Sequence, residues 1–214
     1  MSLSAQDWLR NFYSEFLDIC ETEENFGKRV TNGKWTKTMT EFLANLGQKL
    51  GYEVKGERLR IDQMWKKQGE TIAIEHEIKD EGIFEKEIPN LMSVKAHLRV
   101  LITYVRDYQF PYKAVETGDK VKVALSQRDS EFDEDEEFLL VIGTKTPKRR
   151  KKGKRGKRLR DFMSRHSDWL AYRFHPIFKP EIKADVLQTT KTGLRSEAAR
   201  KAWATRKARI GISH

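Results

Sequence analysis

Residues 59–79 read Leu-Arg-Ile-Asp-Gln-Met-Trp-Lys-Lys-Gln-Gly-Glu-Thr-Ile-Ala-Ile-Glu-His-Glu-Ile-Lys, and this stretch decides the fold. The runs 59–65 and 72–79 both alternate apolar and polar side chains, which is typical of half-buried strands. A short polar loop with a glycine, residues 66–70, separates the two runs. The sequence therefore predicts a β-hairpin.

Three acidic residues lie in this hairpin, Asp62 in the first strand and Glu75 and Glu77 in the second. Residues two apart in a strand point to the same face, so Glu75 and Glu77 share one face. If the turn is centred on Gln68 and Gly69, Asp62 lies directly across from Glu75. Directly opposed residues carry their side chains on the same face, with Cβ atoms roughly 5 Å apart.

Like charges that face each other across a sheet destabilise it, and the carboxylate of Glu77 adds to the repulsion. A hard divalent cation would neutralise such a cluster, because Mg²⁺ and Mn²⁺ prefer carboxylate oxygens. Alternatively, one carboxylate faces solvent or pairs with Arg60 or Lys79, and no ion binds. The hairpin alone leaves both interpretations open.

The composition indicates a polyanionic partner. The chain has 214 residues, of which 38% are hydrophobic and 35% charged, and its formal net charge is +10. This balance favours nucleic acid as the partner, with an anionic membrane as the weaker alternative. The single cysteine, Cys20, excludes an internal disulfide framework and a cysteine-rich zinc site.

The sequence also gives expectations about the compartment. No apolar run approaches the roughly 18 residues that a membrane span needs. The segment 1–8 has neither the basic nor the apolar part of a signal peptide. We therefore expect a cytoplasmic, nucleoid-associated protein without membrane partners, or a nuclear one in a eukaryotic cell. The sequence leaves a homodimer open.

Around the hairpin, the periodicity predicts an α/β core. Helices are expected over 4–20, from Thr36 or Thr38 to Gly51, and over 83–97, with a loop at 21–34 and strands at 52–58 and 99–104. Because a helix separates the strand of Glu75 from the buried strand 99–104, these two strands should be parallel. Residues 106–128 are ambiguous, with one more strand compatible with 120–125. Residues 138–143 should form the last strand of the core.

The C-terminal third departs from this pattern. Seven acids crowd residues 129–137, which predicts a solvated loop or, alternatively, a mimic of nucleic acid that covers a basic groove. Ten of the thirteen residues 148–160 are Lys or Arg, typical of a flexible arm that contacts phosphates, with a solubilising tether as the alternative. Residues 161–186 are rich in aromatics and should pack back on the core. Residues 196–209 predict a short basic helix.

These features divide the chain into a core (1–145), a basic linker (146–160) and a C-terminal segment (161–214). Base stacking by Trp169 or Tyr172 is a weaker alternative to burial. The expected nucleic-acid contacts are Lys148, Arg149, Arg150, Lys151, Lys152, Lys154, Arg155, Arg200, Lys201, Arg206 and Lys207.

The order helix, three-strand meander, helix and buried strand over residues 36–105 resembles the PD-(D/E)XK nuclease superfamily. The resemblance depends on Arg60-Ile-Asp62 and on Ile74-Glu-His-Glu77. It implies a restriction-endonuclease-like fold, in which an αβββαβ core forms a mixed sheet flanked by helices. The basic C-terminal extension would be an addition to that core.

The resemblance also implies the site residues. Asp62 matches the first aspartate of the motif, although Ile61 stands where the family has proline. The remaining pair is either Glu75-x-Glu77 or Glu77-x-Lys79, and the hairpin register favours the first, with Lys79 kept as a candidate. Glu41 matches the acid that the first helix often contributes. His76 should face the helices as a satisfied core histidine.

The activity implied is metal-dependent hydrolysis of phosphodiester bonds, with a DNA endonuclease as the expected enzyme. Asp62, Glu75, Glu77 and Glu41 are the candidate ligands for Mg²⁺ or Mn²⁺. Glu77 or Lys79 would orient or deprotonate the attacking water. A catalytically inactive nuclease fold that binds DNA or serves as an adaptor is the alternative, and an RNA-binding module is a third.

Overall fold

The computed structural model describes residues 2–23, 26–27, 30–57, 60–78, 82–128, 132–133, 135–147, 160–162, 169–177 and 181–189. The helical elements are α1 (Ala5–Thr22), α2 (Asn32–Lys49), the π-helix η1 (Ile83–Glu87), α3 (Ile88–Met92), the 3₁₀-helix η2 (Asp107–Gln109) and α4 (Tyr112–Ser126). The strands are β1 (Glu53–Lys55), β2 (Gln63–Lys67), β3 (Glu70–Glu77), β4 (Leu98–Arg106), β5 (Glu137–Pro147), β6 (Arg160–Phe162), β7 (Trp169–Ile177) and β8 (Glu181–Thr189).

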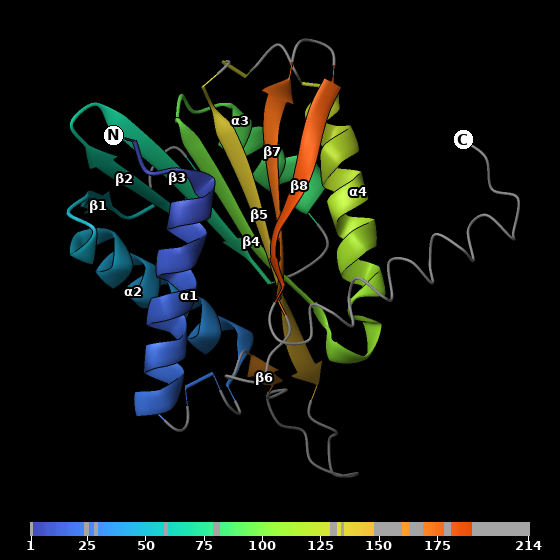
Figure 1. Cartoon of the computed structure of the whole chain (residues 1–214). Helices are drawn as coiled ribbons and strands as arrows, with labels where there is room; N and C mark the ends of the chain where they lie inside the picture. Colours follow the sequence, from blue (N-terminus) through green and yellow to red (C-terminus); the bar gives the residue numbers. More distant parts are fainter. Residues whose placement is uncertain are drawn as a thin grey trace, which may run out of the picture.

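All the described strands belong to one mixed sheet, in the order β1-β2-β3-β4-β5-β7-β8, and β6 also pairs with β5. β1, β2 and β3 form an antiparallel meander, whereas β3, β4 and β5 run parallel. β7 and β8 return antiparallel. The α/β class, with a mixed sheet flanked by helices, is therefore confirmed, as is the parallel pairing of the strand of Glu75 with the next buried strand (Figure 1).

The hairpin has the predicted register, because Gln63 pairs with Ile74 and Lys67 pairs with Glu70. Its turn is shorter than the predicted loop and consists of Gln68 (φ 48°) and Gly69 (φ 87°). Two consecutive residues with positive φ are the signature of the tight turns that match the twist of a hairpin. The turn thus fixes the register on which the position of the acidic residues depends.

α1 and α2 are capped by hydroxyl side chains. Ser4 precedes α1, as predicted, and accepts a hydrogen bond from the backbone N–H of Asp7. Thr31 caps α2 in the same way by accepting from the N–H of Lys34 at 3.3 Å, so α2 begins earlier than the prediction at Thr36 or Thr38. The helix ends as predicted before Gly51, whose φ of +80° is typical of the residue that follows a helix.

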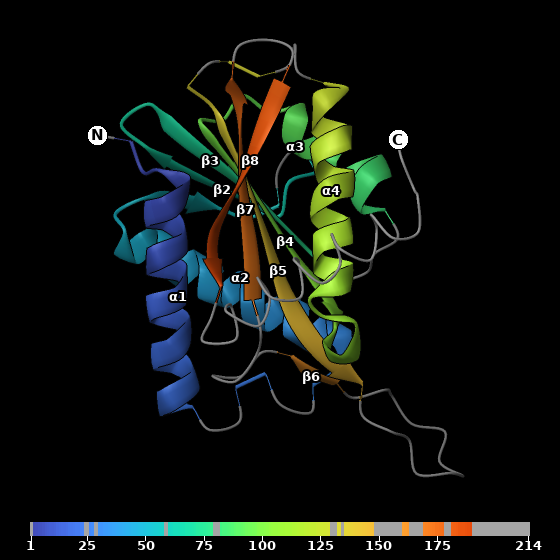
Figure 2. The same ribbon diagram turned by 45° about the vertical axis from the view of Figure 1, so that its right-hand side comes forward.

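The sheet separates two apolar clusters. α1 and α2 cover one face, where Trp8, Phe12, Trp35 and Trp65 are fully or almost fully buried together with alternate residues of β3 and β4. α3 and α4 cover the opposite face with a second buried cluster. Figures 1 and 2 show the two helix pairs on opposite sides of the sheet. Alternate residues of β3 therefore point toward different pairs of helices.

Two predictions in the middle of the chain are wrong. Residues 120–125 are not a strand but part of α4, which buries Ala114, Val121 and Leu125 at helical spacing against the sheet. The alternation of Lys and Val at 120–123 resembles a strand locally, but it covers less than two turns of this helix. The helix predicted over 83–97 is replaced by the short pair η1 and α3, with Pro89 in the first turn of α3, where a missing N–H is tolerated.

The C-terminal aromatic segment packs on the core, as predicted, but it does so as part of the sheet. β5 is not the last strand, because β7 pairs with β5 and buries Trp169, Tyr172 and Phe174. The ring of Tyr172 fills the space above Gly118 of α4, where a Cβ atom would lie only 2.7 Å from it. Burial of Trp169 and Tyr172 leaves their rings unavailable for base stacking.

The acidic run is not uniformly solvated. Glu136 is 4% exposed and pairs with Arg99 at 2.8 Å, and Glu137 accepts a hydrogen bond from the N–H of Ala5 at 2.7 Å. Asp133 and Asp135 are exposed, and the other acids of the run lie outside the described residues. The prediction of a solvated loop is therefore wrong for Glu136 and Glu137, which connect the start of β5 to β4 and α1.

In the part of the chain that the structure describes, no helix has the length and apolar character needed to cross a bilayer. The basic residues predicted to contact nucleic acid, from Lys148 to Arg155 and from Arg200 to Lys207, lie outside the described residues, and so does the predicted helix 196–209.

Candidate functional site

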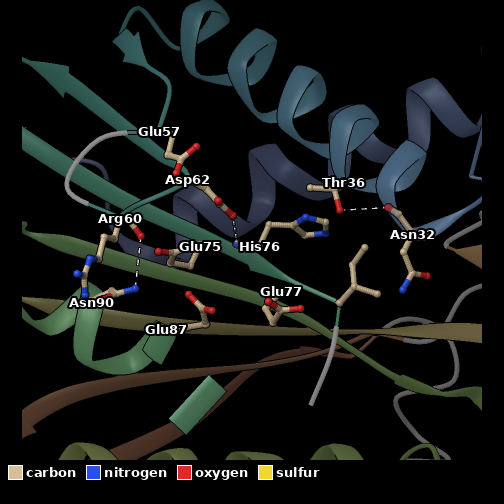
Figure 3. Close-up of a pocket in the computed structure, with 11 residues that line it drawn as sticks. Asn32, Thr36, Glu57, Arg60, Asp62, Glu75, His76, Glu77, Glu87 and Asn90 are labelled. Carbon is tan, nitrogen blue, oxygen red and sulfur yellow. Dashed lines mark hydrogen bonds between the residues drawn. The ribbon is translucent and has the colours of Figure 1, made fainter. Parts of the chain in front are cut away.

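A cavity of about 370 Å³ lies at the carboxyl end of β3. β2 begins at Gln63, opposite Ile74. The end of β3 from Glu75 onward therefore extends beyond β2, while it still pairs with β4 on its other side. Figure 3 shows the side chains around this gap in the sheet. The lining residues are Asn32, Thr36, Glu57, Arg60, Asp62, Glu75, His76, Glu77, Ile78, Glu87 and Asn90.

Asp62 and Glu75 meet at this point, as the hairpin register predicts. The carboxylate of Asp62 accepts a hydrogen bond from the backbone N–H of His76 at 2.9 Å. This N–H lies beyond the last backbone pair between β2 and β3, so a side chain and not a β2 carbonyl satisfies it. The carboxyl groups of Asp62 and Glu75 lie close enough to each other to influence each other's ionisation. The buried side chain of Ile61 anchors the segment just before this contact.

The two carboxyl groups have raised pKa values. Burial, together with the negative charges of Asp62 and Glu87, raises the pKa of Glu75 from 4.5 to about 9. Burial also raises the pKa of Asp62, with added repulsion from Glu77 and Glu57, although the hydrogen bond from His76 opposes this shift. Without a bound cation, the folded protein therefore favours the protonated form of this pair.

Glu77 and Glu87 complete the acidic side of the cavity. Glu77 lies two residues after Glu75 and on the same face of β3. Glu87 approaches from the end of η1, and burial together with the charges of Glu77 and Asp62 raises its pKa. The sequence reasoning missed Glu87 and also Glu57, which precedes the hairpin. A signal for Glu87 existed, because the crossover after β3 must return over one face of the sheet.

Two of the predicted site residues are not placed at the cavity. Glu41 is an exposed residue of α2 that pairs with Lys37 at 3.7 Å, and the α2 residues that reach the cavity are Asn32 and Thr36. Lys79 lies outside the described residues. Of the two alternative pairs, Glu75-x-Glu77 therefore has both members at the cavity beside Asp62.

His76 faces α1 and α2, as predicted, and contributes the opposite wall of the cavity. Its Nε2 lies 2.8 Å from the hydroxyl of Tyr104, and burial lowers the pKa of the imidazole to about 3. The ring is therefore neutral. Its Nδ1 atom is buried and has no hydrogen-bond partner, so the prediction of a satisfied core histidine holds for only one of the two ring nitrogens.

The fit of a divalent cation can be judged from the donor atoms. Among the described residues, no three His, Cys, Asp or Glu side chains are arranged to hold a metal ion together. Magnesium, however, commonly takes only one or two carboxylates and keeps several waters. Asp62 and Glu75 supply two such carboxylates, and Oε1 of Glu75 is buried without a partner. The cavity thus fits a hydrated Mg²⁺ or Mn²⁺ better than a fully protein-ligated ion such as zinc.

Comparison of the chain with protein-family models, with curated proteins and with solved structures finds no match.

Proposed function

We propose that this protein is a Mg²⁺- or Mn²⁺-dependent nuclease that hydrolyses phosphodiester bonds, with DNA as its main substrate. The observation that carries the proposal is the close approach of the half-buried carboxyl group of Asp62 to the buried carboxyl group of Glu75 at the wall of an open cavity. Two acids that disfavour each other's charge are stable together when a proton or a cation lies between them.

The arrangement of the elements supports the same proposal. α2, the meander β1-β2-β3, the short helices η1 and α3, and β4 follow one another in the order that the resemblance to PD-(D/E)XK nucleases implies. The pairing is also the expected one, antiparallel within the meander and parallel between β3 and β4. The acids lie on the second and third strands of the meander or directly beside them.

Each residue has a distinct role in the proposed reaction. Asp62 and Glu75 would hold the ion, and in doing so Glu75 would lose the proton that it retains in the metal-free protein. A bound divalent ion supplies a Lewis acid for the scissile phosphate and lowers the pKa of a coordinated water. Glu77, on the same face, would orient the attacking water and accept its proton. Lys79 remains the alternative to Glu77 in this role.

Plasmid nicking in the presence of Mg²⁺ or Mn²⁺ tests the proposal. We expect wild type to nick the plasmid, Asp62→Ala/Glu75→Ala to lose this activity by a factor of 100 or more, and EDTA to abolish it. Glu41→Gln is a matched control, because it removes an acid of the same predicted set that lies on the surface of α2. Equal nicking by wild type and the double variant would disprove the proposed site.

One observation favours the alternative function, a catalytically inactive fold that binds DNA. The raised pKa of Glu75 favours a protonated carboxyl group in the folded protein, so the pair can be buried without a metal ion. Titration with Mn²⁺, followed by the broadening of NMR signals around β3, separates the two functions. DNA binding without Mn²⁺ binding and without nicking would support the inactive protein.

A further inference from the structure

Two tyrosine side chains are exposed where β4 leads into α4. Tyr108 in η2 is 67% exposed, and Tyr112 at the start of α4 is 57% exposed. All the other aromatic side chains whose burial the structure describes are buried or half-buried. Single exposed apolar side chains are ordinary on protein surfaces, so exposure alone assigns no role to these rings. Their position and their fixed geometry carry the argument.

The ring of Tyr108 is held in place by its neighbours. Nη1 of Arg106 donates a hydrogen bond to the Tyr108 hydroxyl at 2.7 Å, and the guanidinium carbon lies 6.0 Å from the ring centroid. The backbone N–H of Tyr108 donates to the side chain of Asp107 at 2.8 Å. Phe110 packs against the apolar cluster under α3 and α4 and anchors the same turn. The ring is therefore open to solvent and already oriented, which lowers the entropy cost of binding to it.

Tyr108 and the acidic cavity lie on the same edge of the sheet. β3, β4 and β5 are parallel, so their carboxyl ends are directed to one side of the molecule, where Figure 1 also shows the start of α4. Thr103 of β4 is level with Glu77, and Arg106 lies three residues further along, about 10 Å at the rise of a strand. Ligands of open α/β sheets commonly bind at this edge.

A continuous series of contacts joins the cavity to the exposed ring. Ile78, which lines the cavity, accepts a hydrogen bond at its backbone carbonyl from Nζ of Lys145 on β5. Lys145 is the register partner of Arg106 on β4, and Arg106 donates to Tyr108. Two cationic side chains therefore lie between the cavity and the ring, where a bound polyanion would pass.

Basic side chains combined with an exposed aromatic ring are typical of surfaces that bind single-stranded nucleic acid. The cations contact the phosphates, and the bases stack on the ring whatever their sequence. In a duplex each base is already stacked between its neighbours and paired, so only an unpaired base can lie on such a ring without an added cost of unstacking.

We propose that Tyr108 stacks on an unpaired base of the strand whose scissile phosphate lies at Asp62 and Glu75, and that the preferred substrate is single-stranded DNA. Arg106 and Lys145 contact phosphates between the stacked base and the scissile phosphate. This inference rests on the proposed function and names the substrate class of the same site.

Binding to three oligonucleotides tests the stacking contact. The probes are a thymidine strand of about 12 nucleotides, the same strand with abasic sites in place of all bases, and a blunt duplex of equal length, each labelled with fluorescein. Fluorescence anisotropy is measured in Ca²⁺ to prevent turnover. We expect Tyr108→Leu to bind the thymidine strand about tenfold more weakly than wild type, the loss typical of one stacked base. The two proteins should bind the abasic strand equally well, and likewise the duplex.

Tyr108→Phe is the matched control, because it keeps the aromatic ring and removes only the hydroxyl that Arg106 holds. It should bind the thymidine strand within about threefold of wild type, whereas leucine keeps an apolar side chain without a π-face. Equal binding of the thymidine strand by wild type and Tyr108→Leu would overturn the inference. A loss of the same size with the abasic strand would also overturn it, because the ring would then contact the backbone and not a base.

A readout from wild type alone makes the test independent of how the variants fold. Strands that carry 2-aminopurine at successive positions lose fluorescence where this base stacks on a ring. We expect the quenching on binding to be strongest at one position of the strand. Absence of quenching at every position would overturn the stacking contact.

Failure of this inference is distinguishable from failure of the proposed function, because binding is measured without turnover. Wild-type protein that nicks plasmid while Tyr108→Leu binds the thymidine strand as well as wild type does overturns only the stacking contact. Wild-type protein that never nicks overturns the nuclease, whatever Tyr108 contributes to binding.

Discussion

The protein buries carboxylates in two places, and it compensates them in opposite ways. At the amino end of β4, Glu136 accepts a hydrogen bond from Nη1 of Arg99 at 2.8 Å, and a second from the N–H of Asp133 at 3.1 Å. Arg99 also donates to three backbone carbonyls, those of Leu91, Val94 and Ala96. Its charge has a partner, and all three nitrogens of its guanidinium group donate hydrogen bonds inside the protein.

At the carboxyl end of β3 the situation is different. Glu75 is as buried as Glu136, with 3% of its surface exposed, but its nearest charged neighbours are other acids. A proton replaces the missing positive charge, and one oxygen of Glu75 remains without a partner. The carboxylate of Glu136 stabilises the fold through Arg99, whereas Glu75 is stable in its buried position only with a proton or an added cation. This contrast favours the β3 end as the place of chemistry.

The largest effect should come from breaking the compensated pair. Arg99→Met would leave Glu136 buried without its positive partner and remove the donor for three carbonyls. Loss of one member of a buried ion pair costs about 3–5 kcal/mol in the free energy of unfolding. Urea denaturation measures this loss, and Arg99→Met/Glu136→Gln should recover part of it. A loss below 1 kcal/mol would mean that the pair contributes no more than a surface contact.

The acidic pair Asp62 and Glu75 at the carboxyl end of β3, which has no positive partner, should respond to an added cation. Mg²⁺ binds the folded protein through Asp62 and Glu75, so it should raise the free energy of unfolding by about 2.7 kcal/mol when its concentration is 100 times the dissociation constant. The melting temperature, measured with and without Mg²⁺, reports this gain. Asp62→Asn/Glu75→Gln should abolish the gain, while Glu41→Gln should keep it. A melting temperature that rises equally in all three proteins would indicate a nonspecific effect of salt.

The sequence predicts the pair Asp62 and Glu75 better than it predicts the ion pair of Arg99 and Glu136. Strict alternation and the tight turn at Gln68 and Gly69 fix the hairpin register, and that register alone places Asp62 beside Glu75. This information is local and needs no other part of the chain. The parallel strand after the crossover follows from the handedness and length of such connections.

The remaining features depend on contacts between distant segments. Arg99 and Glu136 are 37 residues apart, and their pairing depends on how β4 and β5 align. Glu87 lies at the end of η1 and lines the cavity together with residues of β3. α4 packs against β7 where Gly118 meets the ring of Tyr172. No local pattern in the sequence specifies these contacts.

The smallest effect is the pH dependence of the free energy of unfolding, which tests whether Glu75 is protonated in the folded protein when no cation is bound. The folded protein raises the pKa of Glu75 from 4.5 to about 9, so the folded state keeps a proton that the unfolded chain loses in this range. In EDTA, the free energy of unfolding should therefore fall as the pH rises from about 4.5 toward 9, by at most about 1.4 kcal/mol per pH unit from this group. Glu75→Gln should remove this slope, because an amide has no proton to lose.

Urea denaturation at pH 6 and pH 7 measures the slope for both proteins. Equal slopes in wild type and Glu75→Gln would mean that Glu75 does not keep an extra proton in the folded protein. A positive charge would then have to compensate Glu75, as Arg99 compensates Glu136, and the contrast between the two carboxylates would disappear.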